Sequence, residues 1–283
     1  MPLQTNLEGL PGFLLIGAMK AGTTSLFNWI AAQSEVFVPT VKEPGYFGDP
    51  RAWKRGLEWY ASLFADARPG QLTGEASVIY THPSRSATVA SRVGRVLPNA
   101  KLIFLARDPV ERLRSHYKHE VLRGRERRRM EEVLLDASSD YVVRSLYFAC
   151  LEPFVHQFPR EQIHVAEAED LFGADGESWR KILAFLGMDD RPRPDIHSNA
   201  SADRAQFSQL ARLSWDRGFR RPPVRLPQVV RRIARPVFIR SRPSPLLATA
   251  EATIPDHVMS SISDDRDRLD DWLGHQTAGW VRG

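Results

Sequence analysis

The chain has 283 residues, of which 42% are hydrophobic and 10% aromatic, so it can form a substantial core and is not disordered as a whole. A single cysteine, Cys150, excludes a disulfide framework and a cysteine-rich zinc site. The formal net charge is +5, and only six of the 39 cationic residues are lysines. The excess of arginine favours anionic ligands, although a genomic base bias would produce the same excess.

The first half of the chain alternates short apolar runs with amphipathic stretches, a pattern typical of a parallel sheet covered by helices. Continuous apolar runs predict buried strands at residues 13–17, 101–105 and 162–166. Helices are predicted at 23–33, from Asp108-Pro109 onward, over most of 130–158, at 178–186 with Gly187 as C-cap, and at about 255–273. We expect one α/β domain with a long Arg- and Pro-rich excursion at about 195–250, which could form part of the acceptor site or a lid.

The segment between the first strand and the first helix reads Gly17-Ala18-Met19-Lys20-Ala21-Gly22-Thr23-Thr24-Ser25. Loop N–H groups, the positive end of the helix and the hydroxyl groups together form a cradle for an anion. The segment is not a Walker A loop, because residue 23 is Thr and the lysine lies inside the loop at position 20. An enzyme that binds nucleoside triphosphates through a Walker A loop would therefore lack the lysine that usually contacts the phosphates.

A second landmark follows about 85 residues later, where the strand at 101–105 leads to Arg107 and a helix that contains Ser115. A guanidinium group and a hydroxyl group in this order can grip a phosphate, although Arg107 could instead form an ion pair with Asp108 or Glu111. The two landmarks together resemble sulfotransferases that use 3′-phosphoadenosine 5′-phosphosulfate (PAPS). Further similarity to the heparan-sulfate and bacterial carbohydrate-type branch comes from the segments at 41–47, 56–64, 74–77, 144–147 and 273–280.

This resemblance implies a single sulfotransferase domain over residues 1–283, with three layers, a central parallel sheet and a P-loop-kinase-like fold. It implies that Lys20, Ala21, Gly22, Thr23, Thr24 and Ser25 bind the 5′-phosphosulfate, and that Arg107 and Ser115 bind the 3′-phosphate. It also implies Glu43 as the base that accepts the acceptor's proton and Lys20 as the cation that neutralises the leaving oxygen. Lys42, next to Glu43, could contact the sulfonate or simply lie on the surface. No metal is required, and the product nucleotide is 3′-phosphoadenosine 5′-phosphate (PAP).

Two departures from the family pattern concern the binding of the nucleotide and the acceptor. Some animal enzymes of this branch have a lysine after the strand-end Glu75, where this chain has Ala76. The usual K-G-x-x-G loop for the 3′-phosphate is missing after residue 190, and we expect residues 197–201 or an arginine of the 204–242 segment to replace it.

Two arginine-rich runs, at 123–129 and 204–242, raise the question of nucleic-acid binding. Neither run reads as a stacking platform, although 204–242 contains Phe207, Trp215, Phe219 and Phe238, and no nucleic-acid-binding motif accompanies either run. We therefore read each run as a solvated basic face and expect no nucleic-acid partner. The acceptor is expected to be a small molecule, a glycan or a lipid, and the 204–242 run would suit an anionic glycan or a membrane surface. The N-terminal residues lack the features of a secretory signal, and no apolar run approaches the about 20 residues of a membrane span, so we expect a cytoplasmic, bacterial-type enzyme.

Several alternatives remain open at this stage. The chain could be a P-loop nucleotide kinase or a polyanion-binding module without catalysis. His82 could be the base in place of Glu43, although a turn before Pro83 is the simpler role. His116, His119 and Glu120 have the spacing of metal ligands, but packing is the expected role of His116. Cys150 is expected in the core, and the acids of the last helix, Asp264, Asp265, Asp267, Asp270 and Asp271, are expected on a salt-bridged solvent face.

Overall fold

A computed structural model describes residues 9–195, 206–207, 239–240, 244–277 and 280 of the chain. Its centre is a five-stranded sheet with the order β2-β3-β1-β4-β5, in which every neighbouring pair is parallel. The strands are β1 (Phe13–Gly17), β2 (Val36–Phe37), β3 (Leu72–Ala76), β4 (Lys101–Ala106) and β5 (Ile163–Glu167). The three strands predicted from apolar runs are confirmed as β1, β4 and β5.

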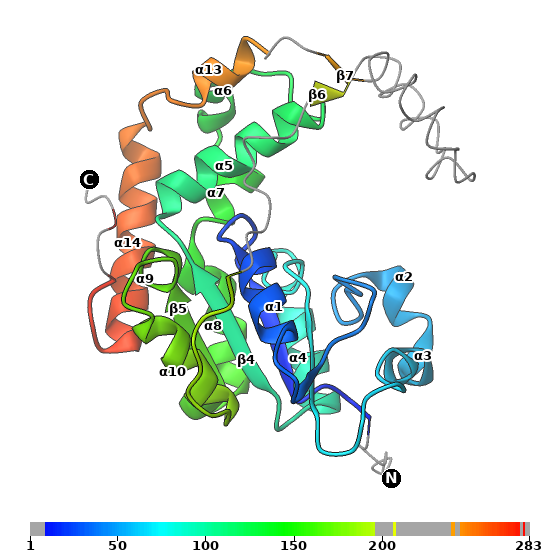
Figure 1. The fold of residues 1–283 in the computed structure, drawn as a ribbon. Helices are drawn as coiled ribbons and strands as arrows, with labels where there is room; N and C mark the ends of the chain where they lie inside the picture. The colour runs from blue at the N-terminus through cyan, green and yellow to red at the C-terminus, as the bar shows by residue number, and fades with distance from the viewer. Residues whose placement is uncertain (1–8, 196–205, 208–238, 241–243, 278–279, 281–283) are drawn as a thin grey trace.

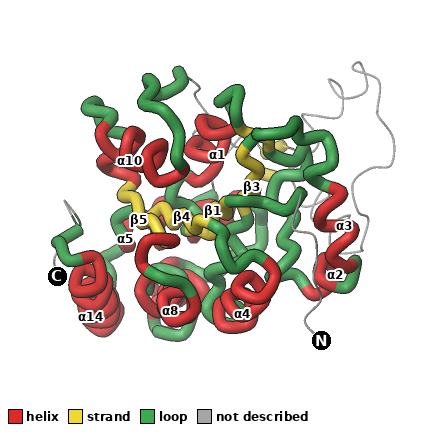
Figure 2. The backbone as a smooth tube through the Cα atoms, turned by 90° about the horizontal axis from the view of Figure 1, so that it is seen from below, coloured by secondary structure: helices red, strands yellow, loops and turns green. Residues whose placement is uncertain are grey.

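Helices cover both faces of the sheet, which confirms the expected three-layer α/β fold (Figures 1 and 2). One face is covered by α1 (Thr23–Ala31) and α10 (Glu177–Leu186), and the other by α4 (Ser86–Val96), α8 (Tyr147–Gln157) and α14 (Asp256–Leu273). The other helices of the described residues are α2 (Pro50–Trp53), α3 (Gly56–Ser62), α5 (Pro109–Leu122), α6 (Met130–Leu134), α7 (Asp140–Val143), the 3₁₀ turn η1 (Arg160–Gln162), α9 (Ala168–Leu171) and α13 (Leu246–Thr249).

The order of the strands determines where a ligand can bind. The chain moves from β1 to β2 and β3 on one side of the sheet, and β4 and β5 lie on the other side of β1. Ligands of such open sheets bind at the carboxyl ends of the strands, next to the strand at which the order reverses. In this chain those ends are Gly17 of β1 and Ala106 of β4, which directly precede the two landmarks of the sequence.

Buried apolar side chains form two clusters. The larger cluster surrounds the sheet and includes Phe13 to Ile16 of β1 and Leu102 to Ala106 of β4. The smaller cluster joins α5, α6, α7, α13 and the first half of α14, and its members include Tyr117 and Val258. Helix α5 therefore connects the end of β4 to a second packed region beyond the edge of the sheet, as Figure 1 shows.

The stretch 130–158 is mostly helical, as expected, and consists of three separate helices, α6, α7 and α8, with turns between them. One expectation about the helices needs correction. The last helix does not expose all of its acids, because Asp265 is 6% exposed and its carboxylate accepts the backbone N–H groups of Phe148 and Ala149 at 2.8 and 2.9 Å. This carboxylate thereby caps the N-terminus of α8 from a different helix, and burial raises its pKa to about 6.

Most of the 195–250 excursion lies outside the described residues. Within it, β6 (Gln206–Phe207) and β7 (Ile239–Arg240) pair as a two-stranded antiparallel sheet. The replacements expected for the 3′-phosphate loop, at 197–201 and in most of 204–242, lie outside the described residues as well.

Candidate active site

The loop between β1 and α1 wraps around the start of the helix. Helix α1 begins at Thr23, and Gly22 before it adopts the left-handed conformation, with φ 98° and ψ 14°. No side chain caps this helix terminus. The N–H groups of its first turn can therefore bind an anion, as the sequence predicts. The Ala18 N–H donates to the carbonyl of Leu105 at 2.8 Å, which ties the loop to the end of β4.

A glycine is needed at position 22 for two reasons. Its φ value lies in the region that residues with a side chain rarely adopt. A Cβ atom at this position would lie 2.7 Å from two ring carbons of Phe172. The Phe172 ring, which is 40% exposed, also packs edge-on against Trp29 of α1 at a centroid distance of 5.3 Å. The start of α1 is thus closely lined by an aromatic ring that the sequence analysis did not single out.

The two residues expected to take part in catalysis share an unusual backbone conformation. Lys20 has φ 73° and Glu43 has φ 58°, and within the described part of the chain these are the two non-glycine residues with positive φ. Such a conformation costs about 1–3 kcal/mol and is often found at functional sites. The strain at Lys20 and Glu43 is therefore an independent reason to regard these two loops as functional.

The loop that contains Glu43 approaches the start of α1. Lys42 Nζ donates to Thr24 Oγ1 at 2.5 Å and lies 3.8 Å from Glu43 Oε1. The Lys42 and Glu43 side chains are 36% and 44% exposed, so both can reach a bound molecule. The structure therefore brings together Glu43 and the anion cradle, which are about 20 residues apart in the sequence.

Arg107 and Ser115 lie at the end of the neighbouring strand. Arg107 follows β4 directly, and Asp108 Oδ1 caps α5 by accepting the Glu111 N–H at 2.8 Å. The Arg107 guanidinium group lies 3.6 Å from Glu111 Oε2 and is 34% exposed. Its ion pair therefore lies at the surface, and the guanidinium group can reach a phosphate. Ser115, which is partly buried, lies within α5, about two helical turns beyond Arg107.

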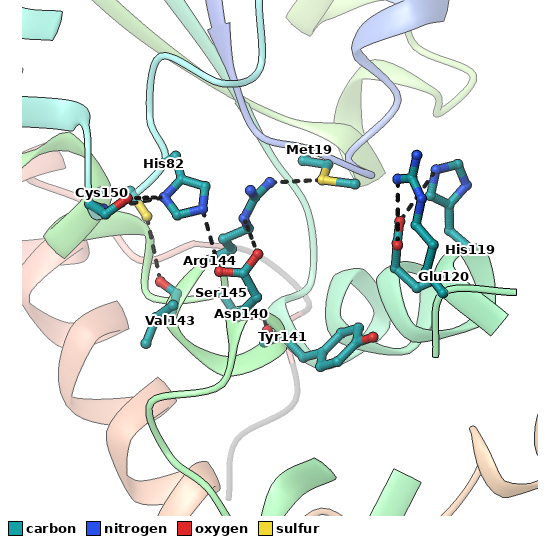
Figure 3. A network of polar contacts seen from close by, with 12 residues as sticks. Met19, His82, His119, Glu120, Asp140, Tyr141, Val143, Arg144, Ser145 and Cys150 are labelled. Carbon is teal, nitrogen blue, oxygen red and sulfur yellow. Dashed lines mark hydrogen bonds and ion pairs between the residues drawn. The ribbon is translucent and has the colours of Figure 1, made fainter. Parts of the chain in front are cut away.

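A chain of polar groups lies beside the loop between β1 and α1 (Figure 3). Arg144 donates to the sulfur of Met19 at 2.9 Å and pairs with Asp140, which also lies 3.4 Å from His82 Nε2. His82 Nδ1 accepts the backbone N–H of Ser84 at 3.2 Å. Both ring nitrogens of His82 are therefore engaged, and burial followed by the nearby Arg144 charge lowers its pKa. This arrangement argues against His82 as the base.

The other residues weighed from the sequence have structural surroundings. His116 is 4% exposed and packs against the ring of Tyr141 at 4.6 Å, which confirms its packing role. Burial of its ring lowers its pKa to about 2. Cys150 is buried as expected. Ala76 is 1% exposed, so its position presents no group to a ligand. Within the described residues, no group of three or more His, Cys, Asp or Glu could hold a metal ion.

The arginine run at 123–129 is largely compensated by nearby acids. Arg128 pairs with Glu126 at 2.8 Å, Arg125 with Glu120 at 3.6 Å, and Arg129 with Glu131 at 3.3 Å. These contacts favour a solvated surface over a polyanion-binding site in this run. Among the described helices, none is long and apolar enough to cross a membrane.

Comparisons with known proteins identify relatives of the chain. Residues 10–221 match the family model of the sulfotransferase domain. Heparan sulfate glucosamine 3-O-sulfotransferase 3A1 of Mus musculus is 29% identical over 194 residues, which are 66% of this chain and 48% of that protein. Membrane-associated sulfotransferase kil1 of Dictyostelium discoideum is 38% identical over 120 residues, which are 41% of this chain and 24% of that protein. These matches span half or less of each curated relative.

A solved structure gives a match over nearly the whole chain. The crystal structure of a sulfotransferase from Alicyclobacillus acidocaldarius superimposes with a TM-score of 0.67 and 22% sequence identity. The match covers 95% of this chain and 98% of that one. At this level of identity the match establishes a shared fold.

Proposed function

The chain belongs to the sulfotransferase family, and on this premise we propose that it transfers the sulfuryl group of PAPS to a hydroxyl group of an acceptor. The observation that carries the proposal is the contact between Lys42 and Thr24, which holds the loop with Glu43 beside the uncapped start of α1. This contact supports a site at which the helix terminus would bind an anion and the Glu43 carboxylate would accept a proton.

The residues present fit the PAPS donor. The open N-terminus of α1, with Lys20, Ala21, Gly22, Thr23, Thr24 and Ser25, would hold the 5′-phosphosulfate through N–H groups, hydroxyl groups and one cation. Arg107 would bind the 3′-phosphate with its guanidinium group and release Glu111, and Ser115 would contribute a hydroxyl donor. The countercharge comes from Lys and Arg side chains, so the proposal includes no metal.

The proposed reaction is an in-line displacement at sulfur. The acceptor oxygen forms a new S–O bond, while the bond between sulfur and the bridging phosphate oxygen breaks and its electron pair leaves with PAP. Lys20 stabilises the negative charge on this leaving oxygen. Glu43 accepts the proton of the acceptor hydroxyl, a role worth about 10²- to 10⁴-fold in rate. Lys42, next to Glu43 and hydrogen-bonded to Thr24, would contact the sulfonate oxygens.

The names of the relatives suggest which acceptor to test first. The mouse relative acts, by its name, on the 3-hydroxyl of glucosamine in heparan sulfate. We therefore propose a glycan hydroxyl as the first acceptor class, with lipid and natural-product hydroxyl groups as the other arms of an acceptor panel with labelled PAPS. The cytoplasmic, bacterial-type character expected from the sequence stays a prediction.

The donor assignment is tested by ligand-dependent thermal stability. The protein is heated with PAP, with ATP and magnesium, and with heparin in separate titrations. Stabilisation by PAP at low concentration supports the proposal. Strong stabilisation by ATP with magnesium and none by PAP would favour a nucleotide kinase. A response to heparin alone would favour a polyanion-binding module.

The residue roles are tested by sulfate transfer with the Lys20→Ala and Glu43→Gln variants. We expect Glu43→Gln to lower kcat by about 10²-fold or more while PAP binding is retained. Lys20→Ala should lower kcat and also weaken the binding of PAP. The matched controls are Lys101→Ala and Glu161→Gln, because Lys101 begins β4 and Glu161 lies in η1, directly before β5, so both are at the amino ends of the strands. A Glu43→Gln variant with full turnover would refute the assignment of the base.

A further inference from the structure

A buried carboxylate lies close to the loop that contains Glu43. Glu75, in strand β3, is fully buried, and three hydroxyl groups donate to it. Ser77 Oγ donates to Glu75 Oε2 at 2.8 Å, Tyr60 donates to Oε1 at 3.2 Å, and Tyr80 also donates to Oε1. These donors come from helix α3 and from the segment after β3, so the carboxylate ties together parts of the chain that are distant in sequence.

The same groups hold the residues that follow Glu43. Ser77 Oγ accepts the backbone N–H of Gly45 at 3.0 Å, so one hydroxyl group links Glu75 to a residue two positions from Glu43. The Tyr46 ring stacks on the Tyr60 ring at a centroid distance of 4.3 Å and an interplanar angle of 9°. Gly45 and Tyr46 therefore contact Ser77 and Tyr60, two of the three side chains whose hydroxyl groups donate to Glu75.

A buried carboxylate at position 75 is energetically unfavourable. Transfer of a charged group into the protein interior is unfavourable unless hydrogen bonds compensate for it. Burial is the largest influence on Glu75 and raises its pKa to about 7; the three hydroxyl donors act in the opposite direction, and the negative charge of Glu43 adds to the rise. The groups that face Glu75 are thus Tyr60, Tyr80, Ser77 and Glu43. An apolar residue would fill the space without this cost, so the carboxylate requires another explanation.

We propose that Glu75 is a positioning residue for Glu43: through Ser77 and Tyr60 it fixes the segment 45–46, and this keeps the Glu43 side chain beside the start of α1. The inference rests on the proposed function, in which Glu43 accepts the proton of the acceptor. Glu43 itself is exposed and strained at φ 58°, so its place depends on the buried residues that follow it.

The first test compares Glu75→Gln with Asp265→Asn, a matched control in which another buried carboxylate becomes an amide far along the chain. We expect Glu75→Gln to lower kcat by about 10- to 100-fold with the KM for PAPS unchanged, because a displacement of about 1 Å can cost 10²-fold in rate. Asp265→Asn should lower thermal stability but leave kcat unchanged. Full kcat in Glu75→Gln, or an equal loss in Asp265→Asn, would overturn the proposal.

A pH profile separates positioning from simple loss of stability. In the wild type, protonation of Glu75 as the pH falls through about 7 turns one of its two acceptor oxygens into a hydroxyl donor, which disturbs the three hydrogen bonds, so kcat should fall in this range. Glu75→Gln cannot titrate and should lack this part of the profile. Tyr60→Phe is a milder second variant in case Glu75→Gln does not fold, with Tyr117→Phe, in the smaller core cluster, as its control. Equal kcat in these two tyrosine variants would count against the proposal.

Hydrogen exchange distinguishes failure of this inference from failure of the proposed function. The Gly45 N–H of the ligand-free protein should exchange faster in Glu75→Gln than in the wild type, whatever reaction the protein catalyses. Unchanged exchange at Gly45 refutes the positioning role. Faster exchange at Gly45, together with full turnover of Glu43→Gln, refutes the assigned base and leaves the structural link between Glu75 and the loop intact.

Discussion

Replacement of Gly22 by alanine perturbs the anion cradle in a way whose magnitude can be estimated. An alanine held at φ 98° costs about 1–2 kcal/mol. Its Cβ atom would also lie 2.7 Å from the Phe172 ring, which must then turn away. Phe172 is 40% exposed and can move, but it loses its edge-on contact with Trp29, worth about 0.5–1.5 kcal/mol. The expected total for Gly22→Ala is about 2–3 kcal/mol of unfolding free energy, or a fall in Tm of about 5–10 °C.

A double-mutant cycle separates the two contributions. Unfolding free energies are measured by urea denaturation for Gly22→Ala, Phe172→Ala and the double variant. Because Phe172→Ala removes the ring that the new methyl group displaces, the double variant should be about 1 kcal/mol more stable than the sum of the single effects predicts. Calorimetric titration with PAP should show binding weakened about tenfold in Gly22→Ala, which corresponds to 1.4 kcal/mol.

Two results would refute this reasoning. Strict additivity in the cycle would show that Phe172 does not restrict residue 22. Unchanged stability and unchanged PAP affinity in Gly22→Ala would show that neither the left-handed conformation nor the close approach of the ring matters for the cradle.

Three further predictions concern other parts of the molecule. Asp265→Ala leaves two N–H groups at the start of α8 without an acceptor and should cost about 2 kcal/mol in urea denaturation; an unchanged midpoint would contradict the cap. Burial lowers the pKa of His164 from 6.5 to about 4, so its contribution to stability is present above pH 6.5 and is lost as the pH falls toward 4. Between pH 7 and 5, the unfolding free energy of the wild type should therefore fall by about 1–2 kcal/mol more than that of His164→Gln. The two proteins must be compared because the raised pKa values of Glu75 and Asp265 change the stability of both in the opposite direction. Burial raises the pKa of the Cys150 thiol to about 12, so a thiol reagent should label it only after unfolding; rapid labelling of the native protein would contradict its burial.

The elements that could be predicted from the sequence are those with a strong local signal. Strands β1, β4 and β5 are continuous apolar runs, because both faces of a parallel strand are covered. Strand β3 has the sequence LTGEA, which contains no such run, and its place next to β1 depends on pairing with distant residues. Helix α4 also lacks a strong local signal, because its arginines and serines leave only a narrow apolar stripe.

In the candidate site, too, the predictable parts are those next to strands with a strong local signal. The cradle at 17–25 and Arg107 directly follow predicted strands, so their common edge of the sheet could be predicted. The contact between Lys42 and Thr24 depends on the path of an irregular loop, for which the sequence has no periodic signal. The burial of Glu75 and of Asp265 runs against the usual preference of carboxylates for the surface, and only the hydrogen bonds of the folded chain account for it.

The pairing of β6 with β7 brings two distant points of the chain together. Phe207 and Ile239 are direct partners in the antiparallel pair, so the first strand ends next to the point where the second begins. Because the cost of closing a loop rises only slowly with its length, the pair itself tolerates changes in the number of residues that connect its two strands.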